Sequence, residues 1–393
     1  MKYAIITPTF KQHFKYIEKY LKSFDKYVID QKEIQLVFTI SASEKNDFLK
    51  ITKNYSKLNI TILCFEDILN HYNINYSSEE LLYIYKKFTF QTLKKFYTML
   101  YVDAEYFLVL DSESMWIRKT CMKELFESYF SAPFLTYSNP EDRDYFDIFS
   151  SAVRENTDYL LNKKCEKWFL ENFVWFYDKK ILLDMFNKVG NPIELAEKIK
   201  ALNNPHRLEW GIFEIELYQV FVYQNNQKYN YKLLDAGQFL KEKLSEDNYL
   251  TYRRNFIQKF DGGCGVLERT MSLLTNSNYR TLAEFFYHNC YSVIRCEESD
   301  FSNFDLQRKF IKIAKPNILA ASQGHAFGIN KPFIVLTRKN PYLRNAWRHF
   351  KNWYYPLKTF LTWFIIEPAK IIFNLLKFLI SEIRHIKYLF IAY

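Results

Sequence analysis

Glycine and proline are scarce in this chain, whose 393 residues include eight glycines and ten prolines. No glycine-rich, basic signature occurs near the N-terminus, which argues against a nucleotidyltransferase, and no internal repeat or low-complexity linker is present. Charged residues (25%) and hydrophobic residues (49%) occur in the proportions of a globular protein, which argues against disorder. Aromatic residues are abundant at 19%, a bias that we attribute to base composition rather than to a sugar-binding platform.

Paired cysteines and long apolar runs are also lacking. The six cysteines form no C-x-x-C pair and no Cys/His zinc spacing, a pattern that suits a reducing compartment. The apolar run Tyr3–Ile6 is too short for a signal peptide, and no run reaches the roughly 18 apolar residues of a membrane span. We therefore expect a cytoplasmic protein.

The net charge of +10 is concentrated at the C-terminus. Residues 338–393 hold ten Lys/Arg and two Asp/Glu, a net +8, which leaves +2 for residues 1–337 and argues against a nucleic-acid partner. Beyond Glu367-Pro368, basic and polar residues recur every three or four positions on an otherwise apolar helix. This pattern is typical of a helix lying on an anionic membrane surface, although it also fits a helix packed on the body or on a partner.

The first third of the chain alternates apolar runs with helical stretches. Strands are expected at Tyr3–Ile6, Ile34–Ile40, Ile60–Phe65 and Tyr106–Leu110, and helices at Phe14–Phe24 and Leu81–Leu100. Residues 145–223 are expected to be mostly helical, with breaks at Asn191-Pro192 and Asn204-Pro205, and further strands are expected at Tyr229–Leu234 and Asn317–Ala321. Strands separated by helices predict an α/β fold with a mainly parallel sheet.

Polar residues follow two of these strands. Thr7 and Thr9 come at the end of the first, where ligands collect in such sheets. Asp111-Ser112-Glu113 follows the buried run Tyr106–Leu110, and alternate residues at a strand end project in similar directions. Asp111 and Glu113 are therefore candidate ligands of a divalent cation that would also bind a diphosphate. A plain polar turn is the alternative.

The Asp-Ser-Glu segment resembles the D-x-D motif of glycosyltransferases with the GT-A fold. Upstream, Gln91 and Lys94 resemble the Q-x-x-K core of a basic helix in bacterial glycosyltransferase-like proteins. The resemblance implies that Gln91, together with Lys94 or Lys95, meets the phosphates of a nucleotide-sugar donor. A solvated helix face is the alternative.

A second segment, His325 to Phe333, resembles the H-x-x-G-x-x-K-P-[WF] motif of the family that includes glycogenin and bacterial lipopolysaccharide galactosyltransferases. In that family the histidine is the third metal ligand, while the glycine and the lysine hold the diphosphate. The resemblance thus implies a metal ligand at His325 and donor contacts at Gly328 and Lys331. A structural histidine in a loop is the alternative.

A third segment, Glu209 to Tyr218, resembles the acidic F-E-x-E-L-Y stretch of the same Q-x-x-K proteins. Read as one helix, it places Glu209 and Glu216 on a common face. Glu214 or Glu216 is a candidate general base for an acceptor hydroxyl or a ligand of donor sugar hydroxyls, and a solvated helix face is the alternative.

Together these features predict a GT-A-like mixed, mainly parallel sheet flanked by helices over residues 1–337, with an amphipathic helical extension over residues 338–393. The expected function is a glycosyltransferase that uses Mn²⁺ or Mg²⁺, with a cell-surface glycan or lipid-linked acceptor, at the inner face of the membrane. The Q-x-x-K and H-x-x-G-x-x-K-P motifs resemble different groups of glycosyltransferases. Whether the transfer retains or inverts the configuration of the sugar therefore stays open. A non-catalytic membrane scaffold and a nucleotidyltransferase are the alternatives.

Overall fold

The computed structural model describes residues 2–116, 119–137, 139, 148–169, 175–235, 238, 242, 294–296 and 318–322. The strands are β1 Tyr3–Pro8, β2 Gln35–Ile40, β3 Ile60–Cys64, β4 Tyr106–Val109, β5 Ser114–Trp116, β6 Phe134–Tyr137, β7 Phe176–Asp178, β8 Lys232–Asp235, β9 Ile294–Cys296 and β10 Ile318–Ser322. The helices are α1 Phe14–Tyr27, α2 Lys45–Thr52, α3 Phe65–His71, α4 Ser78–Tyr101, α5 Met122–Ser131, α6 Ile148–Leu161, α7 Lys179–Val189, α8 Pro192–Ala201, α9 Pro205–Trp210, α10 Glu214–Gln224 and α11 Asn226–Tyr229, with short 3₁₀ turns η1 Lys11–His13, η2 Ala42–Glu44 and η3 Lys53–Tyr55.

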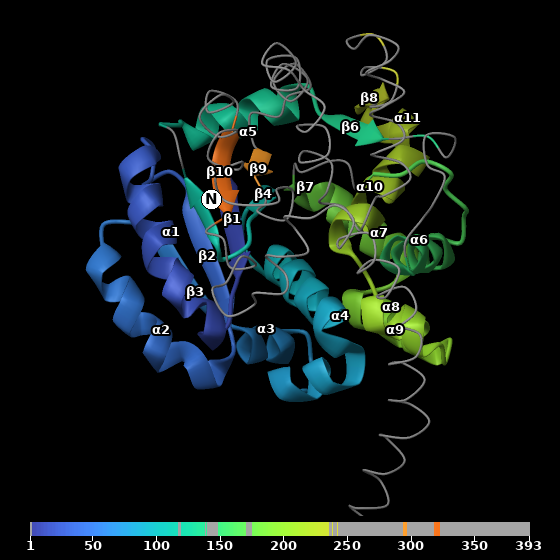
Figure 1. The fold of residues 1–393 in the computed structure, drawn as a ribbon, viewed down its shortest axis with the longest axis horizontal. Helices are drawn as coiled ribbons and strands as arrows, with labels where there is room; N and C mark the ends of the chain where they lie inside the picture. Colours follow the sequence, from blue (N-terminus) through green and yellow to red (C-terminus); the bar gives the residue numbers. More distant parts are fainter. Residues whose placement is uncertain are drawn as a thin grey trace, which may run out of the picture.

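The central sheet has the strand order β3-β2-β1-β4-β7 (Figure 1). The first four strands are parallel, and β7 runs antiparallel to β4. β5 pairs with β10, which also pairs with β9, and β6 pairs with β8. The predicted α/β class with a mixed, mainly parallel sheet is confirmed, and it fits the GT-A-like architecture that the sequence resemblance implied.

Helices cover both faces of this sheet because its strands are apolar on both. In β1, Tyr3 and Ile5 belong to the core on one face, which α1, α2 and α5 complete, whereas Ala4 and Ile6 belong to the other. That second core is completed by α3, α4, α7, α8 and α10. Figure 1 shows α1 and α2 on one side of the sheet and α4 and α7 on the other. The result is a three-layer α/β/α arrangement.

Aromatic side chains fill much of this interior. Trp116 packs edge-on against Tyr20 and Phe24, with ring centroids 4.8 and 5.0 Å apart. Each such contact adds about 1 kcal/mol beyond the apolar area that it buries. The high aromatic content therefore serves the core in the described part of the chain.

The predicted elements of the first third are present with small shifts at their ends. Within the helical stretch, α8 and α9 begin at Pro192 and Pro205, each capped by the preceding asparagine, as the Asn-Pro breaks predict. Three expectations were wrong in detail. Phe176–Asp178 forms β7 rather than helix, part of the expected strand at Tyr229–Leu234 belongs to α11, and Gly211 separates α9 from α10.

Gly211 divides the acidic segment into two helices. Its φ of 48° lies in the left-handed region, and a Cβ on it would fall 1.6 Å from Oγ1 of Thr89 on α4. Only glycine fits both the backbone conformation and the close approach of α4. Glu209 and Glu216 therefore do not share a continuous helix face as expected, and α10 begins at Glu214.

Candidate functional site

The site lies where the strand order of the central sheet reverses. β1 is flanked by β2 on one side and by β4 on the other, so the connections leave β1 in opposite directions. In open α/β sheets, ligands bind beyond the carboxyl ends of the strands at such a switch point. Thr9 follows β1 and Asp111 follows β4, so both lie at this edge.

The Asp111-Ser112-Glu113 segment forms a tight turn rather than a continuation of β4. The Ser114 amide donates to the Asp111 carbonyl at 3.0 Å, and β5 starts at Ser114. The Asp111 side chain is 28% exposed, whereas that of Glu113 is only 7% exposed. The expectation that Asp111 and Glu113 project in the same direction from an extended strand is therefore wrong. The turn places Asp111 in a partly exposed position and Glu113 in a buried one.

Lys95, on the buried face of α4, forms an ion pair with Asp111. Its Nζ lies 3.7 Å from Oδ1 of Asp111, hydrogen-bonds Oε1 of Glu214, and lies 4.5 Å from the ring centroid of Trp175. The Lys95 side chain is 9% exposed. The two carboxylates and the aromatic face hold this ammonium group beside the turn Asp111-Ser112-Glu113, which we call the acidic turn.

Glu214 is held by α4 at the first turn of α10. Glu214 is 1% exposed. Oγ1 of Thr92, on α4, lies 2.9 Å from Oε2 of Glu214 and 2.7 Å from the carbonyl oxygen of Ile212. Its second carboxylate oxygen bonds Lys95. The start of a helix also favours a negative charge. These contacts hold the Glu214 carboxylate beside Lys95.

Glu216, the other predicted catalytic carboxylate, points elsewhere. Two residues along an α-helix correspond to a rotation of about 200°, so Glu216 cannot share the direction of Glu214. The Glu216 charge instead acts on Cys165, where it adds to the burial that raises the pKa of that thiol to about 12. The structure brings Glu214, and not Glu216, to Lys95 and Asp111.

The predicted donor residues near β1 are mostly buried. Thr7 is 1% exposed, and its hydroxyl lies 2.9 Å from that of Tyr20 on α1. Thr9 is 2% exposed and its carbonyl accepts a hydrogen bond from Nζ of Lys94 at 3.1 Å. Gln91, one turn earlier on α4, is half-buried. Thr9 and Lys94 are thus hydrogen-bonded to each other at the end of β1, whereas Thr7 is hydrogen-bonded within the core.

The Lys94 side chain is almost fully buried although it carries an ammonium group. It is 3% exposed, and its Nζ lies 5.9 and 5.6 Å from the ring centroids of Phe65 and Phe90. Burial lowers the pKa of Lys94 to about 8, and only partly offsetting attraction comes from Glu44 and Glu66. Strongly perturbed groups of this kind are common at functional sites.

This burial predicts a specific pH dependence of stability. Between pH 8 and 10.5 the unfolded chain keeps a proton on Lys94 that the folded chain has lost, so this residue makes stability rise with pH there. Below pH 8 both states are protonated and the charge destabilises the fold by about 3 kcal/mol. Lys94→Met should therefore be more stable than the unmodified protein at pH 7, by about 2 kcal/mol after loss of the bond to Thr9.

Urea unfolding at pH 7 and pH 10 measures this difference. The advantage of Lys94→Met should shrink toward pH 10, while Lys19→Met, at an exposed position of α1, should show no pH-dependent gap. An advantage of the same size at both pH values would mean that Lys94 is not a destabilising buried cation.

His13 joins the acidic turn although nothing in the sequence patterns singled it out. Its Nδ1 lies 2.8 Å from Oγ of Ser112 and 3.6 Å from Oε2 of Glu113. Its place in η1, directly after β1, is the one available signal, because residues there share the sheet edge with those after β4. His13 therefore flanks Glu113 as Lys95 flanks Asp111.

The described residues supply only part of the predicted metal set. His325, Gly328 and Lys331 lie outside them, as does the predicted helical extension 338–393. Within the described ranges, no three His, Cys, Asp or Glu side chains gather closely enough to hold an ion. Asp111 and Glu113 have the hard oxygen donors that Mn²⁺ and Mg²⁺ prefer, so they fit such an ion as two of its ligands.

No helix within the described part of the chain is long and apolar enough to cross a membrane.

Comparisons with known proteins give remote structural likeness only. No protein-family model and no curated protein sequence matches this chain. S. aureus TarS aligns with 81% of this chain at 14% identity and a TM-score of 0.32, and the match spans only 53% of TarS. The apo form of mouse xyloside xylosyltransferase 1 aligns with 67% of this chain and 96% of its own at 8% identity and a TM-score of 0.33. Structural likeness at this level carries no argument about function, so the functional proposal rests on the residues of the site.

Proposed function

We propose that this protein is a glycosyltransferase that binds a nucleotide-sugar donor in the crevice between β1 and β4. The observation that carries the proposal is the acidic turn at the switch point of the sheet, with Lys95 on Asp111 and His13 on Glu113. Carboxylates for a cation and a fixed ammonium for phosphate oxygens are the groups that departure of a nucleoside diphosphate requires. The resemblance of the turn to a D-x-D motif supports the same reading.

Asp111 and Glu113 would hold Mn²⁺ or Mg²⁺, which when bound neutralises charge on the departing diphosphate. The buried ammonium of Lys95 would lie beside the same oxygens, held in place by Glu214. Lys94 and the Thr9 carbonyl would form the floor of the crevice. His325, Gly328 and Lys331 remain proposed donor and metal contacts on the strength of their motif.

The acceptor proposed is a cell-surface glycan or a lipid-linked glycan at the inner face of the cell membrane. The charge distribution supports this proposal, because residues 338–393 carry a net +8 of the total +10. Each basic residue near an anionic bilayer contributes roughly 1 kcal/mol of attraction.

Calorimetric titration with UDP and with CMP tests the activity class. We expect one of the nucleotides to bind when Mn²⁺ or Mg²⁺ is present and not in EDTA, and the corresponding nucleotide sugars to be hydrolysed slowly with the same metal requirement. Absence of nucleotide binding with either metal would favour a non-catalytic scaffold. Release of pyrophosphate from a nucleoside triphosphate and a sugar phosphate would favour a nucleotidyltransferase.

A further inference from the structure

A cationic pocket lies in the helical layer, away from the acidic turn. It has a volume of about 920 Å³ and is formed by the C-terminal ends of α6, α7 and α10 together with α8. Glu214 and Gln224 stand at opposite ends of α10, roughly 15 Å apart at the rise of an α-helix. The proposed donor crevice and this pocket therefore lie at different ends of one helix.

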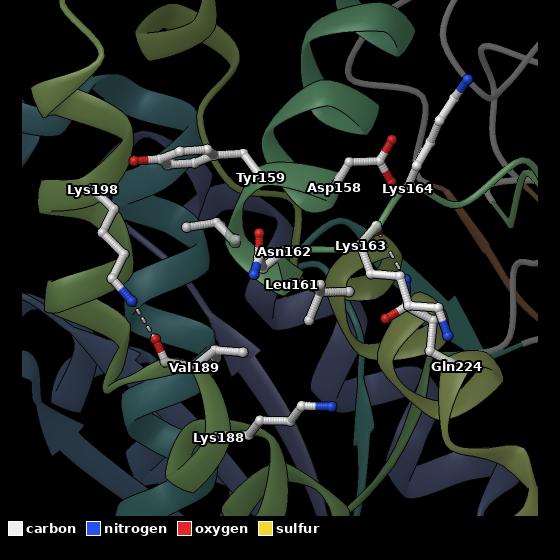
Figure 2. Close-up of a pocket in the computed structure, with 11 residues that line it drawn as sticks. Asp158, Tyr159, Leu161, Asn162, Lys163, Lys164, Lys188, Val189, Lys198 and Gln224 are labelled. Carbon is white, nitrogen blue, oxygen red and sulfur yellow. Dashed lines mark hydrogen bonds between the residues drawn. The ribbon is translucent and has the colours of Figure 1, made fainter.

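Lysines dominate the lining of this pocket. Figure 2 shows Lys163, Lys188 and Lys198 around Leu161 and Asn162, with the Lys164 side chain directed away from them. Asp158 is the one carboxylate among the lining residues, so the lining carries a net +3. A concave surface with charges of one sign focuses the field and attracts ions of the opposite sign.

Three of these lysines are available to a ligand. Lys198 donates to the Val189 carbonyl at 2.6 Å and so closes the end of α7. Among the described residues, no carboxylate forms an ion pair with Lys163, Lys164 or Lys188, although the charge of Lys164 acts on Asp158, and all three lysines are exposed. Lys188 stands in the last turn of α7, where a positive charge is also favoured, whereas Lys163 and Lys164 follow the end of α6 at exposed positions.

The turn that carries Lys163 and Lys164 is fixed by hydrogen bonds. The Cys165 amide donates to Oδ1 of Asp158 at 2.8 Å, and Nε2 of Gln224 donates to the Lys163 carbonyl at 3.1 Å. Arg154 Nε donates to the Cys165 carbonyl at 3.0 Å. A fixed backbone lowers the entropy lost when a ligand is bound.

The Lys163 main chain and the Lys188 side chain both contact the last turn of α10. Gln224 bonds the Lys163 carbonyl, while Nζ of Lys188 lies 5.8 Å from the ring centroid of Phe221, three residues earlier on the same helix. Apolar Leu161 and Val189 line the pocket between the basic groups. The pocket lining thus combines ammonium groups with an apolar wall.

We propose that this pocket binds the phosphate group of an organic phosphate, with Lys163 and Lys188 as its principal contacts. Lysine ammonium groups are common point-charge ligands of phosphate. The phosphate could belong to a soluble molecule or to a lipid headgroup, and both share this chemistry. The proposal does not depend on the transferase activity proposed above.

Calorimetric titration of the full chain with pyrophosphate in EDTA tests the site. Lys163→Gln/Lys188→Gln should weaken binding about twentyfold, because an exposed charge pair contributes up to about fivefold in affinity. Lys19→Gln, which removes an exposed lysine outside the pocket, should bind pyrophosphate as the unmodified protein does. Added salt should weaken the interaction further.

Vesicles distinguish the two sources of phosphate. If phosphatidylglycerol vesicles bind the unmodified protein and the double variant binds them less, a lipid headgroup is the source; if only pyrophosphate binding changes, the source is soluble. No saturable pyrophosphate binding, or equal affinity in the double variant, would each overturn the proposal. In every case the double variant should keep metal-dependent nucleotide binding, which separates this result from a failure of the proposed function.

Discussion

Asp111→Asn is expected to lower metal-dependent turnover of the donor by about a thousandfold while the protein stays folded. An amide at this position removes one proposed ligand of the cation and the charge that faces Lys95 at 3.7 Å. Loss of one group that stabilises developing charge in a closed site reduces rates by about 10²–10³, and loss of the ion adds to this. The Asp111 side chain is partly exposed, so the fold should tolerate an isosteric change.

Steady-state hydrolysis of the nucleotide sugar over a range of Mn²⁺ concentrations measures this effect. Glu105→Gln is the matched control, because it removes an exposed carboxylate just before β4, at the opposite end of that strand. The control should keep full activity and the same metal response. Undiminished activity of Asp111→Asn would show that the acidic turn is a polar connection between β4 and β5 and nothing more.

The central sheet was predictable because its strands are short apolar runs between clear helical periods. Tyr3–Ile6 was expected and β1 extends to Pro8, while the run Ile60–Phe65 became β3 and the start of α3. β7 escaped prediction because its three residues are too few to show a period. It is a strand because Phe176 and Tyr177 pair with β4, a contact that no local pattern encodes.

The sequence predicted which segments form the site, but not the direction in which each side chain points. Lys94 and Lys95 are neighbours rotated by about 100° on a helix, so the motif could not tell which one faces the acidic turn. α4 bends at Lys86, whose φ is 65°, and this bend sets the rotation of the turns that follow. With that rotation, Lys94 contacts Thr9 and Lys95 contacts Asp111.

Two further features depend on contacts between distant parts of the chain. His13 reaches Ser112 across 99 positions in sequence, and only the turn after β4 brings them together. Glu209 could be separated from Glu214 and Glu216 only once Gly211 was known to end α9, because that break sets where α10 begins. Scarce glycine was informative here, although the sequence alone did not reveal the left-handed conformation that requires it.

The second large effect concerns the buried pair of Lys95 and Glu214. Lys95→Met and Glu214→Gln should each lower the free energy of unfolding by about 3 kcal/mol, because each leaves a buried charge without its partner. The double variant should lose less than the sum, with a coupling of about 2 kcal/mol. Urea unfolding of the three variants gives these values. As a control, Lys228→Met breaks an exposed pair with Asp184 and should cost less than about 1 kcal/mol.

Nucleotide binding by the same variants separates two roles of Glu214. If Glu214 acts by holding Lys95 against the diphosphate, both Lys95→Met and Glu214→Gln should weaken metal-dependent nucleotide binding, by about tenfold or more. A general base would give the opposite pattern, with nucleotide affinity unchanged in Glu214→Gln and only kcat lost. We expect the first outcome, because Lys95 and Thr92 already occupy both oxygens of this carboxylate, which is 1% exposed. Full nucleotide affinity in Glu214→Gln would contradict the positioning role and return Glu214 to the position of a candidate base.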